Sequence, residues 1–409
     1  MLIRRVVAIL LVVSLLTVSV WADGGRVLYD ESGGESLEEL LREDAEVWPT
    51  VALPADGADL QVEAKAAVLM DQGTGQVLYE QDAHAHLPIA SVTKVMTLLL
   101  VMEALDSGKI QWTDPVTCSE TAAALGGSQI WLEPGEIMSV EELVKAAVVV
   151  SANDACAALA EHISGSIPAF VSAMNARAAQ LGMTDTEFKD SSGLDDSGYS
   201  CAYDVALMSR ALMEHAEIER FTTIWMDSLR GGASQLVNTN KLVRHYEGAT
   251  GLKTGTTSAA GHCLTATARR GETAFIAVVL GCATTKQRWA GARAMLDYGF
   301  ATYVSYTPPA EAVTVDPIPV LRGQQRQVAV AADPAVRLLL AKGTEGEVRV
   351  ETQPAADLEA PVAAGQTVGV WRVMQGEELL GEYPLRAVCD VPAVTLRWAY
   401  GLLMNALLK

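Results

Sequence analysis

Hydrophobic and polar positions follow different periods along the chain, and the first pattern is an almost unbroken apolar run near the N-terminus. The run extends from Val6 to Val20 behind two arginines and is followed by Trp21 and Ala22, and the small residue Ala22 suits cleavage after it. It is shorter than the roughly 20 residues that a membrane-spanning helix needs. We therefore expect residues 1–22 to be a cleaved export signal rather than a retained anchor, so that the mature protein acts outside the cytoplasm.

The next stretch, residues 23–60, is rich in Asp, Glu, Gly and Pro, and we expect it to be an acidic spacer outside the folded core. Two short apolar runs follow at 65–70 and 76–79. The sequence Asp-Gln-Gly-Thr-Gly between them predicts a β-hairpin. The folded core is expected to begin with this hairpin.

Apolar positions recur with a helical period from residue 91 to about residue 212, and strand-like alternation returns after them. The expected elements are helices over 141–150, 154–163, 167–181 and 288–298 and strands over 261–268 and 273–280. Strands therefore bracket a mostly helical middle. This order predicts an α+β fold over residues 61–307, in which helices form one wall of a cleft and a sheet the other.

The pattern changes again after Pro308 and Pro309. Alternating apolar positions beyond them predict further strands over 313–320, 327–331, 346–351 and 368–374. We expect a separate β-rich domain over residues 310–389. Its sequence has no cluster of histidines, cysteines or paired carboxylates that would suggest a site.

The last predicted element is a helix over residues 391–409 with one narrow polar stripe. Arg397, Gly401, Asn405 and Lys409 recur every four residues, and mostly apolar side chains cover the rest of the helix. The helix is too short to span a bilayer, and an apolar face of this width is typical of helices that lie in a membrane surface. The alternative is a helix docked on the β-rich domain.

Composition excludes one class of partner and leaves the state of the cysteines open. The formal charge of −20 repels polyphosphates and argues against a nucleic-acid partner. Six irregularly spaced cysteines allow disulfides in an exported chain, but free buried thiols are the preferred interpretation. No C-x-x-C or His-x-x-x-His spacing suggests a structural metal, and we expect no ligation by His84 and His86, which lie in a polar loop.

Candidate chemistry begins with a serine and a lysine three positions apart, Ser91 and Lys94, where the helical pattern starts. Residues at this spacing share a helix face, so the side chains can touch, and the helix N-terminus favours an anion at Ser91. A lysine among apolar side chains is desolvated, which lowers its pKa and provides a neutral amine as a base. In isolation, the pair is more simply explained as a capping serine and a lysine that reaches solvent.

Two further polar motifs follow. Ser151 and Asn153 form a Ser-x-Asn motif between predicted helices, where a hydroxyl can pass a proton to a leaving group and a carboxamide can donate to a carbonyl. Lys253-Thr254-Gly255 is expected at a strand edge, where the glycine lets a ligand backbone approach. Each motif alone is a weak signal. The ordered set of three is typical of penicillin-binding proteins and β-lactamases.

The chain around these motifs resembles the serine-type D-alanyl-D-alanine carboxypeptidases, the low-molecular-mass penicillin-binding proteins. The blocks LPIASVTKVMT, VVSANDACAALAEHISGS and GATGLKTGTTSAAGHCLTATARR carry the resemblance, which is close over residues 60–305. It implies a β-lactamase/transpeptidase-like catalytic domain, with an antiparallel sheet flanked by helices and a helical subdomain. The resemblance extends more loosely through the β-rich domain and the terminal helix.

The resemblance implies a role for each motif residue. Ser91 would be the nucleophile that forms the acyl-enzyme, and Lys94 would take its proton. Ser151 would relay a proton, and Asn153 would hold the acylating peptide.

The same resemblance implies how the substrate carboxylate and the oxyanion are bound. Lys253 and Thr254, which precede Gly255, would meet the carboxylate. The backbone N–H groups of Ser91 and Thr256 would form the oxyanion hole.

Three further positions bear on substrate binding. Arg288 stands where the family places an arginine that helps bind the terminal carboxylate, and the alternative for it is a surface charge at the start of a helix. His262 replaces a tyrosine that is common in the family, and Ser191-Ser192 replaces a step that usually contains Asn or His. These two departures concern substrate preference rather than the chemistry.

The resemblance thus implies an exported, membrane-associated enzyme that removes the terminal D-alanine from peptidoglycan stem pentapeptides, needs no cofactor and is inhibited covalently by β-lactams. A class A-like β-lactamase is one alternative, but it needs a glutamate with a partner asparagine, and Ser191 stands four positions after Glu187. A catalytically silent cell-wall-binding protein is the other. Binding alone would not need both a nucleophile and a base.

Overall fold

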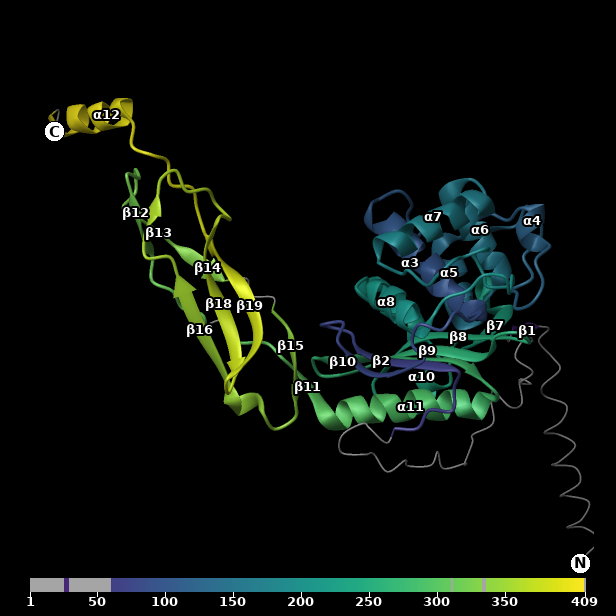
Figure 1. Ribbon diagram of the computed structural model, residues 1–409. Helices are drawn as coiled ribbons and strands as arrows, with labels where there is room; N and C mark the ends of the chain where they lie inside the picture. The colour runs from purple at the N-terminus through teal and green to yellow at the C-terminus, as the bar shows by residue number, and fades with distance from the viewer. Residues whose placement is uncertain (1–25, 29–59, 310–311, 333–335, 408–409) are drawn as a thin grey trace, which may run out of the picture. The chain divides into compact units, whose positions relative to one another are not determined.

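The computed structural model describes residues 26–28, 60–309, 312–332 and 336–407. The predicted export signal and most of the predicted spacer lie outside these residues. The chain divides into two compact units, Met1–Gly299 and Phe300–Lys409, and each is considered by itself (Figure 1).

The first unit is built on a five-stranded antiparallel sheet with the strand order β3-β2-β10-β9-β8. Its strands are β2 (Ala66–Asp71), β3 (Val77–Gln81), β8 (Ala249–Thr257), β9 (Gly261–Arg270) and β10 (Thr273–Cys282). All of β2 is buried, as is typical of a strand covered on both faces. In this sheet β8 pairs only with β9 and forms an edge. The β2–β3 hairpin confirms the prediction for this part of the chain.

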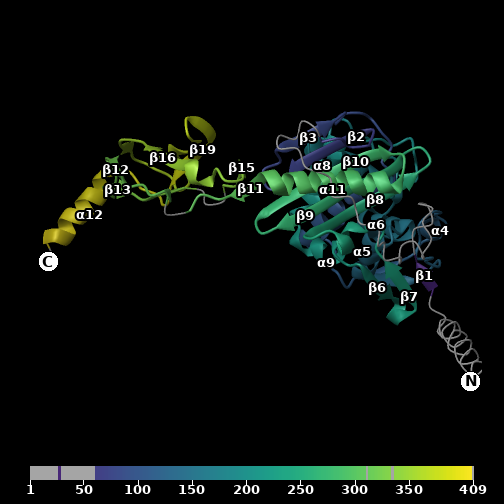
Figure 2. The same ribbon diagram turned by 90° about the horizontal axis from the view of Figure 1, so that it is seen from below.

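Helices cover both faces of this sheet (Figure 1). One face carries α11 (Thr285–Thr302), and Figure 2 shows it running across the strands. The other face carries α8 (Ala202–Met213), which packs on β2 and β10, and the helical subdomain lies beyond it. The main helices of that subdomain are α3 (Lys94–Asp106), α5 (Val140–Val149), α6 (Asn153–Ser164) and α7 (Ile167–Gln180). The predicted α+β class is confirmed.

Short elements complete the first unit, and most of them were not predicted. They are the helices α4 (Glu120–Ala123), α9 (Glu219–Thr222) and α10 (Leu242–His245) and the strands β1 (Arg26–Leu28), β4 (Pro115–Thr117), β5 (Ile137–Ser139), β6 (Met226–Leu229) and β7 (Ser234–Val237). Runs of three or four residues are too short for either period to stand out in the sequence.

Part of the predicted spacer belongs to the fold. The strand β1 pairs in parallel with β7, and Leu60 is buried. The prediction that residues 23–60 lie outside the folded core is therefore wrong at these positions. Backbone pairing uses N–H and C=O groups that every composition supplies, so an acidic average did not reveal it.

Local sequence sets the ends of the helices that border the site. Ser139 and Glu142 form a capping box that begins α5. Gly165 ends α6 in the left-handed conformation, with φ of 77°. Ser166 then caps α7. These caps explain why α5, α6 and α7 begin and end within one residue of their predicted bounds.

The second unit is β-rich, as the sequence predicts. A four-stranded sheet has the order β14-β19-β18-β16, a three-stranded sheet has the order β13-β12-β17, and β11 pairs with β15. The strands are β11 (Tyr303–Tyr306), β12 (Ile318–Leu321), β13 (Gln327–Val328), β14 (Val330–Ala332), β15 (Leu338–Ala341), β16 (Val348–Pro354), β17 (Leu358–Glu359), β18 (Thr367–Gln375) and β19 (Glu378–Ala387). Trp371, Val373 and Leu385 lie in its apolar core.

Two predictions for the second unit need correction. The strand expected over 313–320 is limited to β12, at the end of that range. The terminal helix does not begin at Val391, because that residue is fully buried and bridges Val362. Helix α12 covers Leu396–Leu407, and Thr395 caps it by accepting a hydrogen bond from the Trp398 N–H at 3.2 Å.

The cysteines form no disulfide. Five of them are free and buried, as preferred from the sequence, whereas Cys389 is free and exposed.

Candidate active site

Ser91 lies in a tight turn rather than inside a helix. The 3₁₀ turn Ala90–Thr93 directly precedes α3, and the Val92 N–H donates to the Ile89 carbonyl at 3.1 Å. Ala90 has a φ of 49°, in the left-handed region that side chains rarely adopt. The turn therefore presents Ser91, which is half-buried, at the N-terminal end of a 13-residue helix.

Lys94, the first residue of α3, is fully buried. Its Nζ lies 2.7 Å from Ser91 Oγ and donates to the Ser192 carbonyl at 2.8 Å. The predicted contact between serine and lysine is confirmed. The alternative of a lysine that reaches solvent is wrong.

The partner of Lys94 is a backbone group from a distant loop. The carbonyl of Ser192 contacts Lys94, and the neighbouring carbonyl of Ser191 accepts from Thr97 Oγ1 at 2.6 Å. Gly193 allows this approach, because a Cβ there would lie 1.9 Å from the Ala90 carbonyl oxygen. These two contacts do not use the side chains of the unusual Ser191-Ser192 step.

Asp190 organises this loop, and the sequence reasoning missed it. Its carboxylate accepts hydrogen bonds from the backbone N–H groups of Ser192, Gly193, Leu194 and Asp195. An aspartate followed by serines and a glycine is a known turn signature. That signal was present in the sequence, but nothing in it pointed to Lys94.

Ser151 and Asn153 lie between α5 and α6, as predicted. Ser151 has a φ of 62°, is fully buried, and its Oγ has no hydrogen-bond partner within the described part of the chain. Asn153 Nδ2 donates to the Gly126 carbonyl at 2.7 Å. Its Oδ1 is likewise buried without a partner among the described residues. Two polar atoms of the motif are thus withdrawn from water and unpaired.

Asp154 is a second residue that the sequence reasoning missed. Its carboxylate is fully buried and accepts from the backbone N–H groups of Ile130, Leu132 and Ala155. Burial raises the pKa of this carboxyl group, while these hydrogen bonds oppose the shift. The contacts fix the loop that follows Gly126, beside Asn153.

The Lys-Thr-Gly motif lies on the edge strand β8, as predicted. Lys253 and Thr254 are buried, and Thr254 Oγ1 donates to Thr239 Oγ1 at 2.7 Å. At Gly255, an added Cβ would lie 2.9 Å from the Ser91 backbone nitrogen. Only glycine lets β8 approach the turn that carries Ser91 this closely. The structure thus brings the Ser-x-x-Lys and Lys-Thr-Gly motifs together.

Arg288 is buried with 6% exposure, so the alternative of a surface charge is wrong. Its Nη1 donates to Thr256 Oγ1 at 3.2 Å, and the guanidinium carbon lies 4.5 Å from the centre of the Trp289 ring. His262 Nδ1 lies 3.4 Å from the same Thr256 hydroxyl and 3.3 Å from Thr285 Oγ1. The side chains of Arg288 and His262 therefore both contact Thr256, the residue after Gly255.

Charges of both signs lie around Cys156 on α6. Burial raises the pKa of its thiol to about 11; the charges of Lys94 and Lys253 act to lower it, and those of Asp154 and Asp190 act to raise it. The buried basic side chains of Lys253 and Arg288 offer positive charge to a carboxylate, although the chain as a whole carries a charge of −20.

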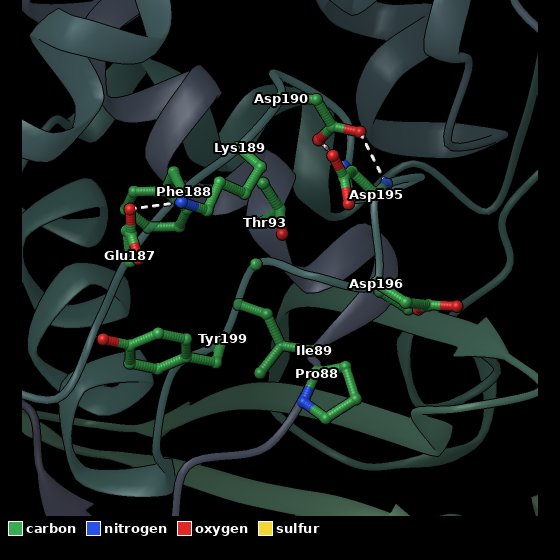
Figure 3. Close-up of a pocket in the computed structure, with 13 residues that line it drawn as sticks. Pro88, Ile89, Thr93, Glu187, Phe188, Lys189, Asp190, Asp195, Asp196 and Tyr199 are labelled. Carbon is green, nitrogen blue, oxygen red and sulfur yellow. Dashed lines mark hydrogen bonds and ion pairs between the residues drawn. The ribbon is translucent and has the colours of Figure 1, made fainter.

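A small pocket lies beside the turn that carries Ser91 and is shown in Figure 3. Its lining includes Ile89 and Thr93 and the acidic loop that contains Glu187. The Glu187 carboxylate forms an ion pair with Lys189, and its backbone bridges Tyr199. The glutamate considered for a β-lactamase is therefore already engaged within its own loop.

Two family models match the chain. The model described as D-alanyl-D-alanine carboxypeptidase, Peptidase S11, covers residues 52–284, and the penicillin-binding protein 5 C-terminal domain covers residues 306–393. D-alanyl-D-alanine carboxypeptidase DacF of Bacillus subtilis is 41% identical over 351 residues, which is 84% of this chain and 90% of DacF.

Solved structures give the same result. Penicillin-binding protein 5 from Haemophilus influenzae is similar with a TM-score of 0.72 and 31% identity, over 81% of this chain and 98% of that one. Penicillin-binding protein D2 from Listeria monocytogenes, in its ampicillin-bound form, is similar with a TM-score of 0.52 and 33% identity. That similarity covers 59% of this chain and 99% of the Listeria chain.

Proposed function

The chain belongs to the D-alanyl-D-alanine carboxypeptidase family, and we propose that it removes the terminal D-alanine from peptidoglycan stem pentapeptides through an acyl-enzyme on Ser91. It is a serine carboxypeptidase and thus a hydrolase. The observation that carries the assignment to Ser91 is the 2.7 Å contact of its Oγ with the fully buried Nζ of Lys94.

In the acylation step, Ser91 Oγ attacks the carbonyl carbon of the penultimate D-alanine. Its proton passes to Lys94, whose neutral amine offers a lone pair to the hydroxyl. Desolvation favours the neutral amine, and the Ser192 carbonyl orients it. The contact between Gly255 and the Ser91 turn supports an oxyanion hole formed by the backbone N–H groups of Ser91 and Thr256.

The substrate is held by its backbone and by its terminal carboxylate. An edge strand leaves alternate N–H and C=O groups available, so the stem peptide would pair with β8 as an additional strand. Asn153 would bind the acylating peptide. Lys253, Thr254 and Arg288 would bind the carboxylate. All three side chains are buried, so their hydrogen bonds to a charged group would be shielded from water and therefore strong.

The leaving D-alanine needs a proton, and Ser151 would relay it from Lys94. The unpaired, fully buried Ser151 Oγ supports this role, because an unsatisfied buried hydroxyl costs about 1–3 kcal/mol and gains a partner once the substrate binds. Lys94, neutral again, would activate the water that attacks the ester. Hydrolysis returns the proton to Ser91 and releases the shortened stem.

β-Lactams would acylate Ser91 by the same route, because their strained amide takes the place of the terminal peptide bond. The similarity to an ampicillin-bound relative supports this part of the proposal. Deacylation of the bulkier adduct would be slow.

The enzyme would be exported and would bind the outer face of the cytoplasmic membrane peripherally, through α12. None of the described helices has both the length and the apolar character needed to cross a membrane. No residue of α12 is buried, and Leu396, Tyr400 and Leu407 are among its exposed apolar side chains. The absence of buried side chains on this helix does not support the alternative of a helix docked on the β-rich domain, whereas a membrane surface would cover these apolar side chains.

The proposed activity is tested by incubating the purified mature enzyme with a synthetic stem pentapeptide and measuring the released D-alanine. We expect one D-alanine per pentapeptide and no release from the corresponding tetrapeptide. The absence of release from a preparation that still binds penicillin would contradict the carboxypeptidase assignment.

A further inference from the structure

A second cluster of chemically capable side chains lies outside the catalytic machinery. His84 and His86 come from the segment before the nucleophile turn, and Asp185 comes from the segment before the loop that contacts Lys94. His84 Nδ1 lies 2.9 Å from Asp185 Oδ2, and His86 Nε2 lies 2.9 Å from Asp185 Oδ1. The thiol of Cys201 closes the cluster from the buried side.

The spacing of these groups is compatible with a common ion. The candidate ligand atoms of His84, Asp185 and Cys201 all lie within 4.8 Å of one another. A tetrahedral zinc site, with bonds of about 2.0–2.3 Å, places its ligand atoms roughly 3.3–3.6 Å apart. Small side-chain rotations are therefore sufficient to bring the three atoms to one centre, with His86 beside the second carboxylate oxygen.

The backbone that carries these side chains is held by its own hydrogen bonds. Leu87 and Ser200 exchange backbone hydrogen bonds of 2.8 and 3.0 Å, which fix the two segments side by side. The Asp185 N–H donates to the buried carboxylate of Asp204 at 2.9 Å. Cys201, the N-cap of α8, accepts from the Asp204 N–H at 3.3 Å. Backbone hydrogen bonds thus hold the segments that carry the cluster in place.

Aromatic rings restrict both imidazoles. The ring of His86 stacks on Tyr199, with centres 4.6 Å apart and an angle of 16° between the planes. The ring of His84 lies 5.1 Å from Tyr203. Fixed rings lose less freedom when they bind an ion, which favours binding.

We propose that His84, Asp185 and Cys201, assisted by His86, bind a divalent zinc ion. Two imidazoles, one carboxylate and one thiol are the donors that a borderline ion of this kind prefers, and they do not suit magnesium or calcium. The imidazoles bind as neutral groups, with their remaining protons on His84 Nε2 and His86 Nδ1.

The thiol must give up its proton to solvent when zinc binds. The thiol is protonated before the ion arrives, because the ordinary pKa of a cysteine lies above neutral pH. A zinc ion deprotonates a coordinated thiol, and the positive N-terminus of α8 also favours the thiolate. Zinc binding therefore releases one proton from Cys201.

The bound ion would connect two segments that flank the catalytic site. The first runs from His84 into the nucleophile turn, and the second runs from Asp185 to Ser192, whose carbonyl contacts Lys94. Zinc would thus stabilise the arrangement around Ser91 without contacting the substrate.

The mature chain, prepared without a histidine tag, tests the proposal by equilibrium dialysis against zinc chloride and metal analysis. We expect one zinc ion per chain. His84→Ala and Asp185→Asn should each weaken binding at least about tenfold. With cobalt as a probe, the wild type should show a thiolate-to-cobalt absorption band that Cys201→Ser removes.

His215→Ala is the matched control, because His215 forms a similar contact of 2.6 Å with Asp106 but has no third ligand in a described metal cluster. It should bind zinc as the wild type does. Penicillin labelling of every variant shows that the fold is intact and keeps this test separate from the proposed activity. Zinc binding that is absent from the wild type, or unchanged in both His84→Ala and Asp185→Asn, would leave only a His-Asp hydrogen-bond pair and overturn the proposal.

Discussion

The two units of the chain differ most in what they bury. The first unit buries charged and polar side chains, including the basic groups of Lys94, Lys253 and Arg288. In the second unit, the described residues bury only apolar side chains. Removing a charge from water costs several kcal/mol unless partners compensate it, so buried charge is expected where function requires it. The difference supports the proposal that the chemistry belongs to the first unit and that the second has a supporting role.

The sheets of the two units show the same contrast. In the first, the central strand β10 is buried along almost its entire length, because helices cover both faces. In the second, β16 and β19 are partly exposed to solvent. A fully covered sheet holds catalytic groups in fixed positions, whereas a half-exposed sheet leaves surface for a spacer or docking module.

The largest effect is expected from removing the nucleophile of the first unit. Ser91→Ala should abolish covalent labelling by a fluorescent penicillin and lower D-alanine release by at least about 10⁴-fold, because no acyl-enzyme can form. Gel fluorescence and a D-alanine assay measure the two quantities.

Ser172→Ala serves as the control for this experiment, since Ser172 is exposed on α7 and its hydroxyl contacts only the Pro168 carbonyl among the hydrogen bonds described. It should label as strongly as the wild type. Labelling of Ser91→Ala at the wild-type level would mean that the nucleophile lies elsewhere.

A smaller effect is expected from the basic groups that the first unit buries. Amidating the C-terminal carboxylate of the pentapeptide should lower turnover by at least about tenfold, because a desolvated charge pair is lost. Arg288→Ala should reduce turnover of the acid and leave turnover of the amide nearly unchanged. Steady-state rates with both peptides measure the difference.

Arg293→Ala on the same helix is the matched control, because Arg293 is partly exposed and pairs with Asp297 at 3.4 Å. It should discriminate acid from amide as the wild type does. Equal rates for acid and amide with the wild type would remove carboxylate recognition from the mechanism.

Local features of the first unit could be predicted from the sequence, whereas contacts between distant segments could not. Ser91 and Lys94 are three residues apart, which brings their side chains within reach of each other, and the helices α5 to α7 carry strong periods and caps. The Ser192 carbonyl could not be predicted as a partner of Lys94, because a backbone group has no side-chain signature. Its position depends on a loop 98 residues away in sequence.

Long-range pairing also limited the predictions elsewhere. Asp185 is separated from His84 by 101 residues, so the contact between these two side chains could not be predicted from the polar loop around His84. The terminal helix was predicted too long because Val391 and its apolar neighbours fit a helical period. Its bridge to Val362 assigns that segment to the β-rich fold instead.

A stability effect confined to the second unit would sharpen the comparison. Trp371 is almost completely buried, so Trp371→Ala should lower the free energy of unfolding of the β-rich unit by about 3–5 kcal/mol. Calorimetry should show a lower midpoint for one transition, while penicillin labelling at low temperature stays unchanged.

A truncated chain that ends near residue 310 should also keep its penicillin labelling. A soluble, folded truncation that fails to label would show that the site depends on the second unit.

The smallest effect on catalysis, and a large one on location, is expected from removing α12. Deletion of residues 396–409 leaves Val391 and its bridge to Val362 in place and removes only the exposed helix. The mature enzyme should then leave the membrane fraction with its D-alanine release unchanged, because apolar side chains such as Leu396 and Leu407 no longer enter the lipid surface. Sedimentation with anionic vesicles measures binding, and Leu403→Glu, which places a charge on the apolar face, should weaken it in the full chain. Sedimentation of the deleted form with membranes, after the N-terminal signal has been removed, would place the membrane-binding element elsewhere.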